Sequence, residues 1–498
     1  MTQPRASGIL LHPTSLPGPH GLGDLGRRAY EFVDFLVAGG VSLWQILPLG
    51  PTGYGDSPYS AFSAFAGNPL LISLEALVAC GDLETQDIAG AELEEGRADF
   101  AAARELRKRL LPHAARTFFD RGTAARREAF DAFCLDQAHW LEDYVLFRSL
   151  RRQFQEQSWD RWPDEVRRRE AAALNRWREE LVWELAVVRY AQFVFFEQWF
   201  ALKAYANEQG VRLIGDLPIF VAPDSADVWS RPDLFHLDDN QRPTRVAGVP
   251  PDYFSATGQR WGNPLYRWER LAEENFGWWK ERLRWTLSQT DRLRIDHFRG
   301  FCACWAIPAE ETTATRGEWM PVPGEELFAA LQDTFGELPL IAEDLGIINE
   351  EVEALRDRFG LPGMKILQFA FDSGPDNPYL PHNLPRNCLV YTGTHDNATT
   401  LGWWRDLAEP ARRQVVAYLG RENPQIPWDL IHLAIFSVAD SCILPLQDVL
   451  GCDDRARMNR PGHPENNWSW RYLPEDLAPE LAARLREMNR ISGRCRDD

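Results

Sequence analysis

The chain has 498 residues, of which 45% are hydrophobic and 26% are charged. This is the balance of a globular protein that can bury a large core. The net charge is −19, and no long Lys/Arg block offsets it. A phosphate backbone or an anionic leaflet would be repelled by such a charge, so nucleic acid and membrane surfaces are poor partners. A neutral, polar substrate would be neither steered nor rejected.

The N-terminal segment and the cysteines both favour a cytoplasmic protein. The N-terminal segment has one Arg and a short apolar run that His12 and Pro13 stop, so it lacks the apolar core of a signal peptide. No apolar run is as long as a membrane span. The eight cysteines are scattered and include no CxxC pair for zinc or redox chemistry. We therefore expect reduced thiols in a cytoplasmic protein, with the oligomeric state left open.

Short apolar runs that end in a polar residue recur along the chain, each followed by Gly or Pro and a helical stretch. Such runs are typical of buried parallel strands. The eight runs are Gly8–Leu11, Leu43–Leu47, Arg212–Gly215, Leu293–Ile295, Pro339–Ala342, Met364–Phe369, Cys388–Tyr391 and Cys442–Leu446. Stretches such as 27–38, 327–335 and 349–359 are long enough for helices between them. This alternation predicts an α/β fold, a single (β/α)₈ TIM barrel over residues 1–498, and no GxGxxG motif supports a Rossmann sheet instead.

Two of the spacings are too long for a simple strand–helix unit. Residues 75–210, between the second and third strands, are rich in Arg, Glu, Ala and Trp. They predict a mostly helical insertion that ends in a long aromatic helix near 182–207. Residues 217–275, after the third strand, are rich in Pro, Asp and Trp. They predict an irregular loop subdomain that covers the catalytic face of the barrel.

Acidic residues directly follow several of the predicted strands. Asp216 follows the third strand, Asp296 the fourth, Glu343 the fifth and Asp396 the seventh. Barrel enzymes draw their catalytic groups from the carboxyl ends of the strands. We therefore expect these acids to converge on one pocket.

Helix capping is the alternative explanation for any one of these acids. An acid after a strand is often a helix N-cap or a first-turn residue that the helix dipole favours. Asp344 and Asp372 fit this interpretation. Three strands that each deliver an acid, with Arg294 and His395 beside them, are harder to explain by capping.

Three gathered carboxylates suit the transfer of a glycosyl group with retention of configuration. That chemistry needs a carboxylate nucleophile and a protonated carboxylic acid, and a third carboxylate can hold sugar hydroxyls. Arg294 beside Asp296 would keep that carboxylate ionised, which fits the nucleophile. Burial and a neighbouring anion would raise the pKa of Glu343, which fits the acid/base.

Longer segments resemble a known family. They are GILLHPTSLPG, WQILPLGPTGYGDSPYS, GDLPIFV, PPDYFSATGQRWGNPLY, RIDHFRG, AEDLG, THDN and RMNRPGHPENNWSWR. With these motifs the chain resembles the amylomaltases, the 4-α-glucanotransferases of glycoside hydrolase family 77 in the α-amylase clan. The matching segments run almost end to end, and only the insertion around residues 75–180 offers no motif.

The resemblance implies a role for each residue that matches a motif. Asp296 would be the nucleophile, Glu343 the acid/base and Asp396 the stabiliser of the transition state. The implied substrate contacts are Asp216, Arg294, His395 and Tyr59 at the cleavage point, Tyr253, Phe254, Gln259 and Trp261 on the acceptor side, and Tyr54, Ser57 and Asn467 as further glucan contacts. For Tyr54 and Trp261, ordinary packing under a loop is the alternative.

One departure from the family pattern precedes Asn467. The family commonly carries glycine in this segment, whereas this chain has Asn466. Asn is the residue other than glycine that best tolerates the left-handed backbone region. We therefore expect the loop to keep its conformation, with the contact by Asn467 the less certain part of the motif.

The expected activity is the transfer of an α-1,4-glucan segment to the 4-hydroxyl of an acceptor, without a cofactor or a metal. Hydrolysis by the same acids, as in an α-amylase, is the nearest alternative; the aromatic 250–266 loop favours transfer because it would shield the site from water. A non-catalytic glucan-binding protein would not need the intact pair of Asp296 and Glu343. A metal hydrolase would need paired histidines on an early strand, where this chain offers only His12.

Overall fold

Eight parallel strands close into a barrel. In the computed structural model, which describes residues 5–93, 95–251, 255–346, 348–463 and 465–495, each barrel strand pairs with the next one along the chain and the last pairs with the first. The strands are β1 (Ala6–Leu10), β2 (Leu43–Gln45), β3 (Arg212–Pro218), β6 (Arg292–Asp296), β9 (Leu340–Ala342), β10 (Gly363–Ile366), β11 (Cys388–Tyr391) and β12 (Ser441–Pro445). All eight predicted runs overlap these strands, so the predicted (β/α)₈ barrel is confirmed.

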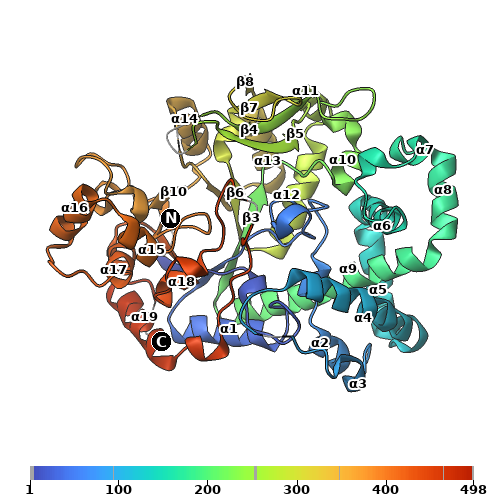
Figure 1. Cartoon of the computed structure of the whole chain (residues 1–498), viewed down its shortest axis with the longest axis horizontal. Coiled ribbons are helices and arrows are strands. Elements are labelled where there is room, and N and C mark those ends of the chain that lie inside the picture. Colours follow the sequence, from blue (N-terminus) through green and yellow to red (C-terminus); the bar gives the residue numbers. More distant parts are fainter. Residues whose placement is uncertain (1–4, 94, 252–254, 347, 464, 496–498) are drawn as a thin grey trace.

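Helices surround the barrel strands (Figure 1). In α1 (Arg27–Ala38), the buried residues Ala29, Phe32, Val33 and Leu36 recur at spacings of three and four, which places one apolar face against the core. The other helices after barrel strands are α12 (Gly277–Gln289), α13 (Gly324–Phe335), α14 (Glu350–Arg358), α15 (Thr400–Asp406), α16 (Glu409–Leu419), α17 (Trp428–Phe436), α18 (Leu446–Val449) and α19 (Pro479–Ile491). The helices predicted near 27–38, 327–335 and 349–359 are all present.

The segment between β2 and β3 folds into helices that lie to one side of the barrel (Figure 1). They are α2 (Leu74–Ala79), α3 (Thr85–Ile88), α4 (Phe100–Arg121), α5 (Ala124–Asp136), α6 (Ala138–Gln153), α7 (Asp164–Arg167), α8 (Ala171–Glu180) and α9 (Val182–Glu208). Helix α9 contacts α1, α4, α5 and α6. Residues 190–196 of α9 are all buried, because neighbours cover the helix on every side.

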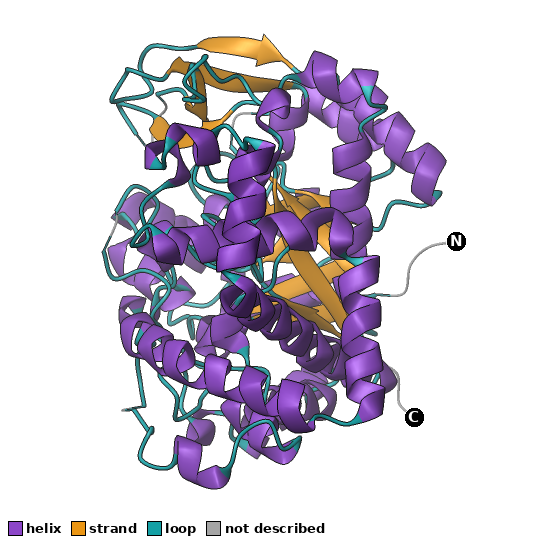
Figure 2. Ribbon diagram, turned by 90° about the vertical axis from the view of Figure 1, so that its right-hand side faces the viewer, coloured by secondary structure: helices purple, strands orange, loops and turns teal. Residues whose placement is uncertain are grey.

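The segment after β3 is more regular than the sequence suggested. Residues 217–275 contain α10 (Ala226–Ser230), α11 (Trp268–Glu273) and two strands, β4 (Arg245–Val249) and β5 (Gln259–Pro264). These strands form an antiparallel sheet, in the order β5-β4-β7-β8, with β7 (Ala303–Pro308) and β8 (Glu318–Pro321) from the segment after β6. This sheet lies above one end of the barrel (Figure 2). Its strands pair across distant parts of the chain, which a local apolar pattern does not reveal.

Several tryptophans are core residues with a bonded indole. The side chains of Trp44, Trp199 and Trp229 are fully buried, and each donates its indole N–H to a backbone carbonyl: Leu11, Gln289 and Val166, respectively. A buried indole N–H needs such a partner. These residues therefore serve packing rather than sugar binding.

Two further observations concern the described part of the chain. None of its helices combines the length and the apolar character that a membrane span requires. All eight cysteines carry free thiols, and Cys304, Cys388 and Cys442 are buried.

Arg494 joins the C-terminus to the point where the barrel closes. Its side chain is buried and donates to the carbonyl oxygens of Ala6 (2.7 Å), Ile435 (2.7 Å) and Ala439 (2.9 Å). Ala6 begins β1, and Ala439 precedes β12. The guanidinium of Arg494 therefore bonds to carbonyls at the start of the first strand and just before the last strand.

Arg494→Ala should destabilise the protein by about 2–4 kcal/mol, because it leaves several buried carbonyls without a donor. Thermal and urea unfolding would measure the loss. The matched control is Arg490→Ala, four residues earlier, in α19, whose exposed side chain pairs with Glu487 and should matter little. Equal stability of the two variants would contradict this role of Arg494.

Candidate active site

The carboxyl ends of three neighbouring strands, β3, β6 and β9, bring three of the predicted acids together. In the β3–β6 register, Asp216 lies opposite Arg294 and Pro218 opposite Asp296. Asp296 is the last residue of β6, and Glu343 directly follows β9. Parallel strands end on the same rim of a barrel, so the side chains of these acids meet there.

Arg294 is the centre of the charged network. Its side chain is buried, its Nη1 atom donates to both carboxylate oxygens of Asp216 (2.8 and 2.7 Å), and its Nη2 atom lies 3.0 Å from Oδ1 of Asp296. Burial alone would lower the pKa of Arg294, but the two carboxylates raise it well above its ordinary value. Arg294 therefore stays charged and fixes both acids in place.

Glu343 has the environment of a protonated carboxylic acid. Burial raises its pKa to about 8, against the opposing charge of Arg294 and with the added repulsion of Asp296. Its Oε2 atom accepts the backbone N–H of His297 at 2.7 Å. His297 has a φ of 53°, in the left-handed backbone region that residues other than Gly and Asn rarely adopt. This strained backbone directs the His297 N–H at Glu343.

His297 itself is neutral and faces a tryptophan. Burial lowers the pKa of its imidazole to about 4. The edge of one ring meets the face of the other between His297 and Trp261, with the ring centroids 4.8 Å apart. His297 Nε2 is buried and has no hydrogen-bond partner in the part of the chain that the structure describes.

Asp396 is oriented by a loop near the C-terminus. Asn459 donates its side-chain amide to Oδ1 of Asp396 at 2.6 Å, and Arg457 donates to the Asp396 backbone carbonyl at 2.7 Å. On the other side, Nε2 of His395 lies 3.4 Å from Oδ2 of Asp396. The carboxylate is therefore held between two different segments.

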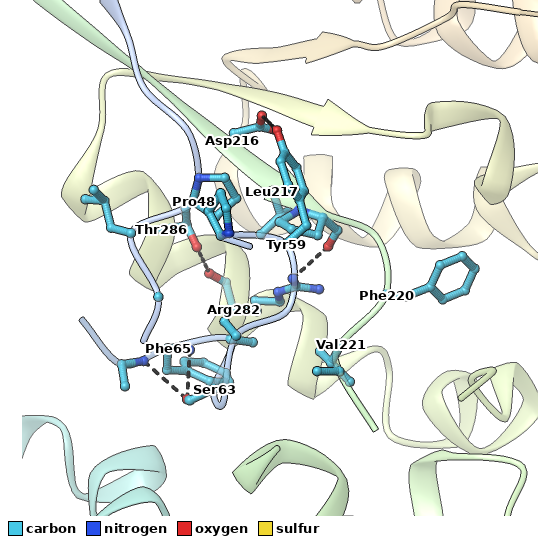
Figure 3. A pocket seen from close by; sticks show the side chains of 18 of the residues that line it. Pro48, Tyr59, Ser63, Phe65, Asp216, Leu217, Phe220, Val221, Arg282 and Thr286 are labelled. Atoms are coloured by element: carbon cyan, nitrogen blue, oxygen red, sulfur yellow. Dashed lines mark hydrogen bonds between the residues drawn. The ribbon is translucent and has the colours of Figure 1, made fainter. Parts of the chain in front are cut away.

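Tyr59 links Asp216 to His395 through its hydroxyl group. The hydroxyl donates to Oδ2 of Asp216 at 2.7 Å, and Figure 3 shows it directed at that carboxylate. Its oxygen lies 3.0 Å from Nε2 of His395. Because its only proton goes to Asp216, Nε2 of His395 is assigned as the donor in the second bond. The rings of Tyr59 and His395 are also stacked, with centroids 5.4 Å apart.

Arg282 supports the strand that carries Asp216. Its guanidinium is buried and donates to the carbonyl oxygens of Pro218 (2.7 Å) and Ile219 (3.2 Å), which end β3. It lines a cavity of about 70 Å³ behind Tyr59 and Asp216, as Figure 3 shows. This cavity is too small for a sugar ring, so Arg282 supports the site without lining its open side.

The open side is a cavity of about 860 Å³, large enough for several sugar units. The predicted residues that line it are Tyr54, Ser57, Tyr59, Gln259, Trp261, Arg294, Asp296, Glu343, Asp396 and Asn467. Asp216 and His395 lie beneath Tyr59 instead, bonded to its hydroxyl. Tyr253 and Phe254 lie outside the described residues.

Two predicted aromatic contacts have exposed faces. Tyr54 is 81% exposed, and Trp261 is 39% exposed. Both line the large cavity. The alternative of ordinary packing under a loop is therefore wrong for Tyr54, and Trp261 keeps a free surface while its indole N–H donates to Gln259 at 3.2 Å. Exposed aromatic faces of this kind suit stacking on sugar rings.

The Asn466–Asn467 segment adopts the expected conformation. Asn466 has a φ of 61°, in the left-handed region that its residue type tolerates. The side chain of Asn467 bonds within its own loop, since it donates to the His463 carbonyl (2.6 Å) and accepts the Arg460 N–H (3.0 Å). Asn467 thus shapes the rim of the cavity as well as lining it.

The capping interpretation of Asp344 is wrong. The N-cap of α14 is Asn349. Asp344 is buried, accepts the backbone N–H of Met364 at 2.7 Å and pairs with Arg356 at 2.5 Å. It therefore ties β9 to β10 and α14. Asp372, the other acid assigned to capping, lines the large cavity and accepts from Asn377 at 3.0 Å.

Sequence reasoning missed the residues that orient the catalytic candidates. Asn459 and Arg457 hold Asp396, and Trp468 lies beside both Tyr59 and His395, with centroids 6.0 Å apart in each pair. All three fall within or beside RMNRPGHPENNWSWR, so that motif was the available signal. Nothing in the motif indicates which strand end it would reach.

Comparisons with known proteins show the family of the chain. The family model described as 4-alpha-glucanotransferase, of glycoside hydrolase family 77, matches residues 11–476. A 4-alpha-glucanotransferase of Thermus thermophilus is 53% identical over 98% of this chain and 99% of that protein. One from Synechocystis is 48% identical over 99% of each. The structure of an amylomaltase from Streptococcus agalactiae in complex with acarbose superimposes with a TM-score of 0.96, at 40% identity, over 99% of this chain and 100% of that one. The chain therefore belongs to glycoside hydrolase family 77, the 4-alpha-glucanotransferases.

Proposed function

We propose that this 4-alpha-glucanotransferase moves an α-1,4-glucan segment from a maltooligosaccharide or starch chain to the 4-hydroxyl of another glucan or of glucose. The reaction would proceed by two displacements through a covalent glucosyl-aspartate, with net retention at the anomeric carbon. The observation that carries the proposal is the charge arrangement around Arg294, with Asp296 paired to it and the pKa of Glu343 raised to about 8.

In the first displacement, Asp296 attacks the anomeric carbon. Its Oδ1 atom faces Arg294 at 3.0 Å, which leaves Oδ2 for the new bond. As the C–O bond of the donor breaks, Glu343 gives its proton to the departing 4-oxygen. The leaving glucan is thus released as a neutral alcohol, and Glu343 becomes a carboxylate.

In the second displacement, the Glu343 carboxylate removes the proton from the 4-hydroxyl of the acceptor. The acceptor oxygen attacks the anomeric carbon and displaces Asp296 as a free carboxylate. Both carboxyl groups return to their starting states. The side chains supply every proton and bond in the cycle, so the proposal requires no cofactor or metal.

The remaining polar groups would bind the sugar at the cleavage point. Asp396, held by Asn459, would bind ring hydroxyls and stabilise the positive charge that develops on the ring. The connected set of Tyr59, Asp216 and His395 would form the floor beneath that glucose. Because these groups are already bonded to one another, they need little reorganisation when the transition state forms.

Transfer rather than hydrolysis is supported by the apolar surfaces at the cavity. Trp261, on the strand β5, presents a partly free face beside His297, whose backbone N–H donates to Glu343. A bound acceptor sugar would stack there and exclude water from the glucosyl-aspartate. We assign Gln259, Tyr253 and Phe254 to the same acceptor side, and Tyr54, Ser57 and Asn467 to further glucan contacts.

The free thiols are consistent with a cytoplasmic enzyme.

Incubation with maltotriose alone should yield oligomers longer than maltotriose together with free glucose. Transfer rearranges chains without changing the number of glycosidic bonds, so the reducing-end total should stay constant. Chromatography of the products and a reducing-end assay would measure both. Maltose and glucose as the only products, with a rising reducing-end total, would instead indicate hydrolysis.

Asp296→Asn tests the assignment of the nucleophile. It should lower the rate of either reaction by roughly 10⁴-fold, since no carboxylate is left to form the intermediate. Asp136→Asn, at an exposed position that ends α5, should behave as the unaltered protein. Full activity of Asp296→Asn would refute the assignment of the nucleophile.

The raised pKa of Glu343 predicts a pH dependence of stability. The unfolded chain releases this proton near the ordinary value of 4.5, whereas the folded protein keeps it until about 8. The folded state therefore binds more protons between these values, and its stability falls as pH rises through this window. In Glu343→Gln this contribution is absent, so its unfolding temperature should decline less between about pH 5 and about pH 9.

Glu353→Gln is the matched control, because Glu353 is an exposed acid on α14. Its unfolding temperature should follow that of the unaltered protein across the same pH range. A Glu343→Gln profile that also follows the unaltered protein would contradict the raised pKa of Glu343.

A further inference from the structure

A second large cavity lies in the helical insertion, apart from the glucan cavity. Its volume is about 420 Å³. It is lined by residues of α4, α6 and α9 and by two stretches that follow β2, 51–53 and 68–70. In Figure 1 these helices lie on the side of the molecule away from α15–α19. None of the acids assigned to glycosyl transfer lines this cavity.

The lining of this cavity is cationic, although the chain as a whole carries a net charge of −19. The acidic residues at its wall are Glu105 and Glu156. The basic residues at its wall are Arg104, Arg107, Lys108, Arg148, Arg151 and Arg152. A concentration of positive charge in one concave place of an acidic protein is the electrostatic signature of a site for an anion.

Two of these arginines form no ion pair with any residue that the structure describes. Arg104 pairs with Asp56, Arg148 with Glu156, and Arg151 with Asp224 and Glu156. Among the described residues, by contrast, no carboxylate lies within ion-pair distance of the exposed residue Arg152, although the charge of Glu156 acts on it from further away. Arg107 is buried and donates to two backbone carbonyls, and its Nε has no hydrogen-bond partner in the same part of the chain. The six basic residues at the wall therefore outnumber its two acidic residues, and the cavity keeps an excess of positive charge.

The positive charges of these arginines also repel one another. Desolvation lowers the pKa of Arg104 and of Arg152, and the charge of Arg148 lowers both further, with the charge of Glu156 partly opposing this. Desolvation lowers the pKa of Arg107 to about 10. All three remain charged near neutral pH, so the repulsion persists. An anion placed between Arg148 and Arg152 would relieve it.

Apart from Thr52 and Asn68, the rest of the wall is apolar and aromatic. Phe62, Tyr144, Leu111 and Val187 contribute to it, and the guanidinium of Arg151 lies 4.4 Å from the centre of the Phe62 ring. Burial raises the pKa of Tyr144 to about 12, so its hydroxyl is neutral. A bare ion would leave this apolar part unused. The cavity suits an anion that carries an organic body.

We propose that this cavity binds a small organic phosphate, such as a hexose phosphate, with the phosphate group between Arg148 and Arg152. Planar guanidinium groups bind phosphate oxygens in pairs, which gives both strength and orientation. The sugar body would lie against Phe62, Tyr144 and the aliphatic wall.

The site lies next to a segment that lines the glucan cavity. Arg104, at the wall of the cationic cavity, pairs with Asp56. Asp56 lies between Tyr54 and Ser57, which both line the glucan cavity. Variants that test the phosphate site should therefore leave Arg104 unchanged, so that the glucan cavity is not disturbed.

Calorimetric titration of the full-length protein with glucose 6-phosphate, inorganic phosphate and glucose would test the proposal. Glucose 6-phosphate should bind in a one-to-one ratio, more tightly than inorganic phosphate, because only the ester uses the apolar wall. Arg152→Gln should weaken its binding by about tenfold, because a charged hydrogen-bond donor is lost. Arg152 has no acid to leave unpaired, so this variant should fold and keep its transfer activity on maltotriose.

Arg109→Gln is the matched control. Arg109 is an exposed arginine of α4 that does not line the cavity. It should bind glucose 6-phosphate as the unaltered protein does. The proposal would be overturned if glucose 6-phosphate did not bind, if Arg152→Gln bound it equally well, or if inorganic phosphate bound as tightly as the ester. Since maltotriose transfer is measured separately, these outcomes do not bear on the glycosyl-transfer mechanism.

Discussion

The buried guanidinium of Arg294, between Asp216 and Asp296, is the interaction on which the active site depends. Removing a charge from water is costly unless charged partners surround it, and here two carboxylates do so. The β3–β6 register places Asp216 directly opposite Arg294, so the barrel itself aligns the pair. Asp296 is the last residue of the strand that carries Arg294, so this strand fixes the position of Asp296 as well.

The same arrangement gives the two acids proposed for catalysis different surroundings. Arg294 lies at 3.0 Å from Asp296, whereas the pKa of Glu343 is raised by burial, which outweighs the opposing charge of Arg294, and further by the negative charge of Asp296. One carboxyl group is therefore placed to attack and the other to hold a proton near neutral pH. The backbone N–H of His297, held by a left-handed φ, fixes the direction in which Glu343 points.

The barrel and its acids could be predicted because both leave local signals. Buried parallel strands give short apolar runs, and a residue such as Glu343 stands directly after one of them. The sheet of β4, β5, β7 and β8 left no such signal as a whole, since its central pairing, β4 with β7, joins segments on the two sides of β6. The hold of Asn459 on Asp396 likewise joins positions far apart in sequence, and only the fold reveals it.

The most direct test of the mechanism is to trap the covalent intermediate on Asp296. Glu343→Gln with α-maltotriosyl fluoride should accumulate the glycosyl-enzyme, because fluoride leaves without an acid while the second displacement lacks its base. Mass spectrometry of the intact protein should show one added maltotriosyl group, and peptide mapping should place it on Asp296. A label on another residue, or release of fluoride with a product of inverted configuration and no label, would contradict the mechanism.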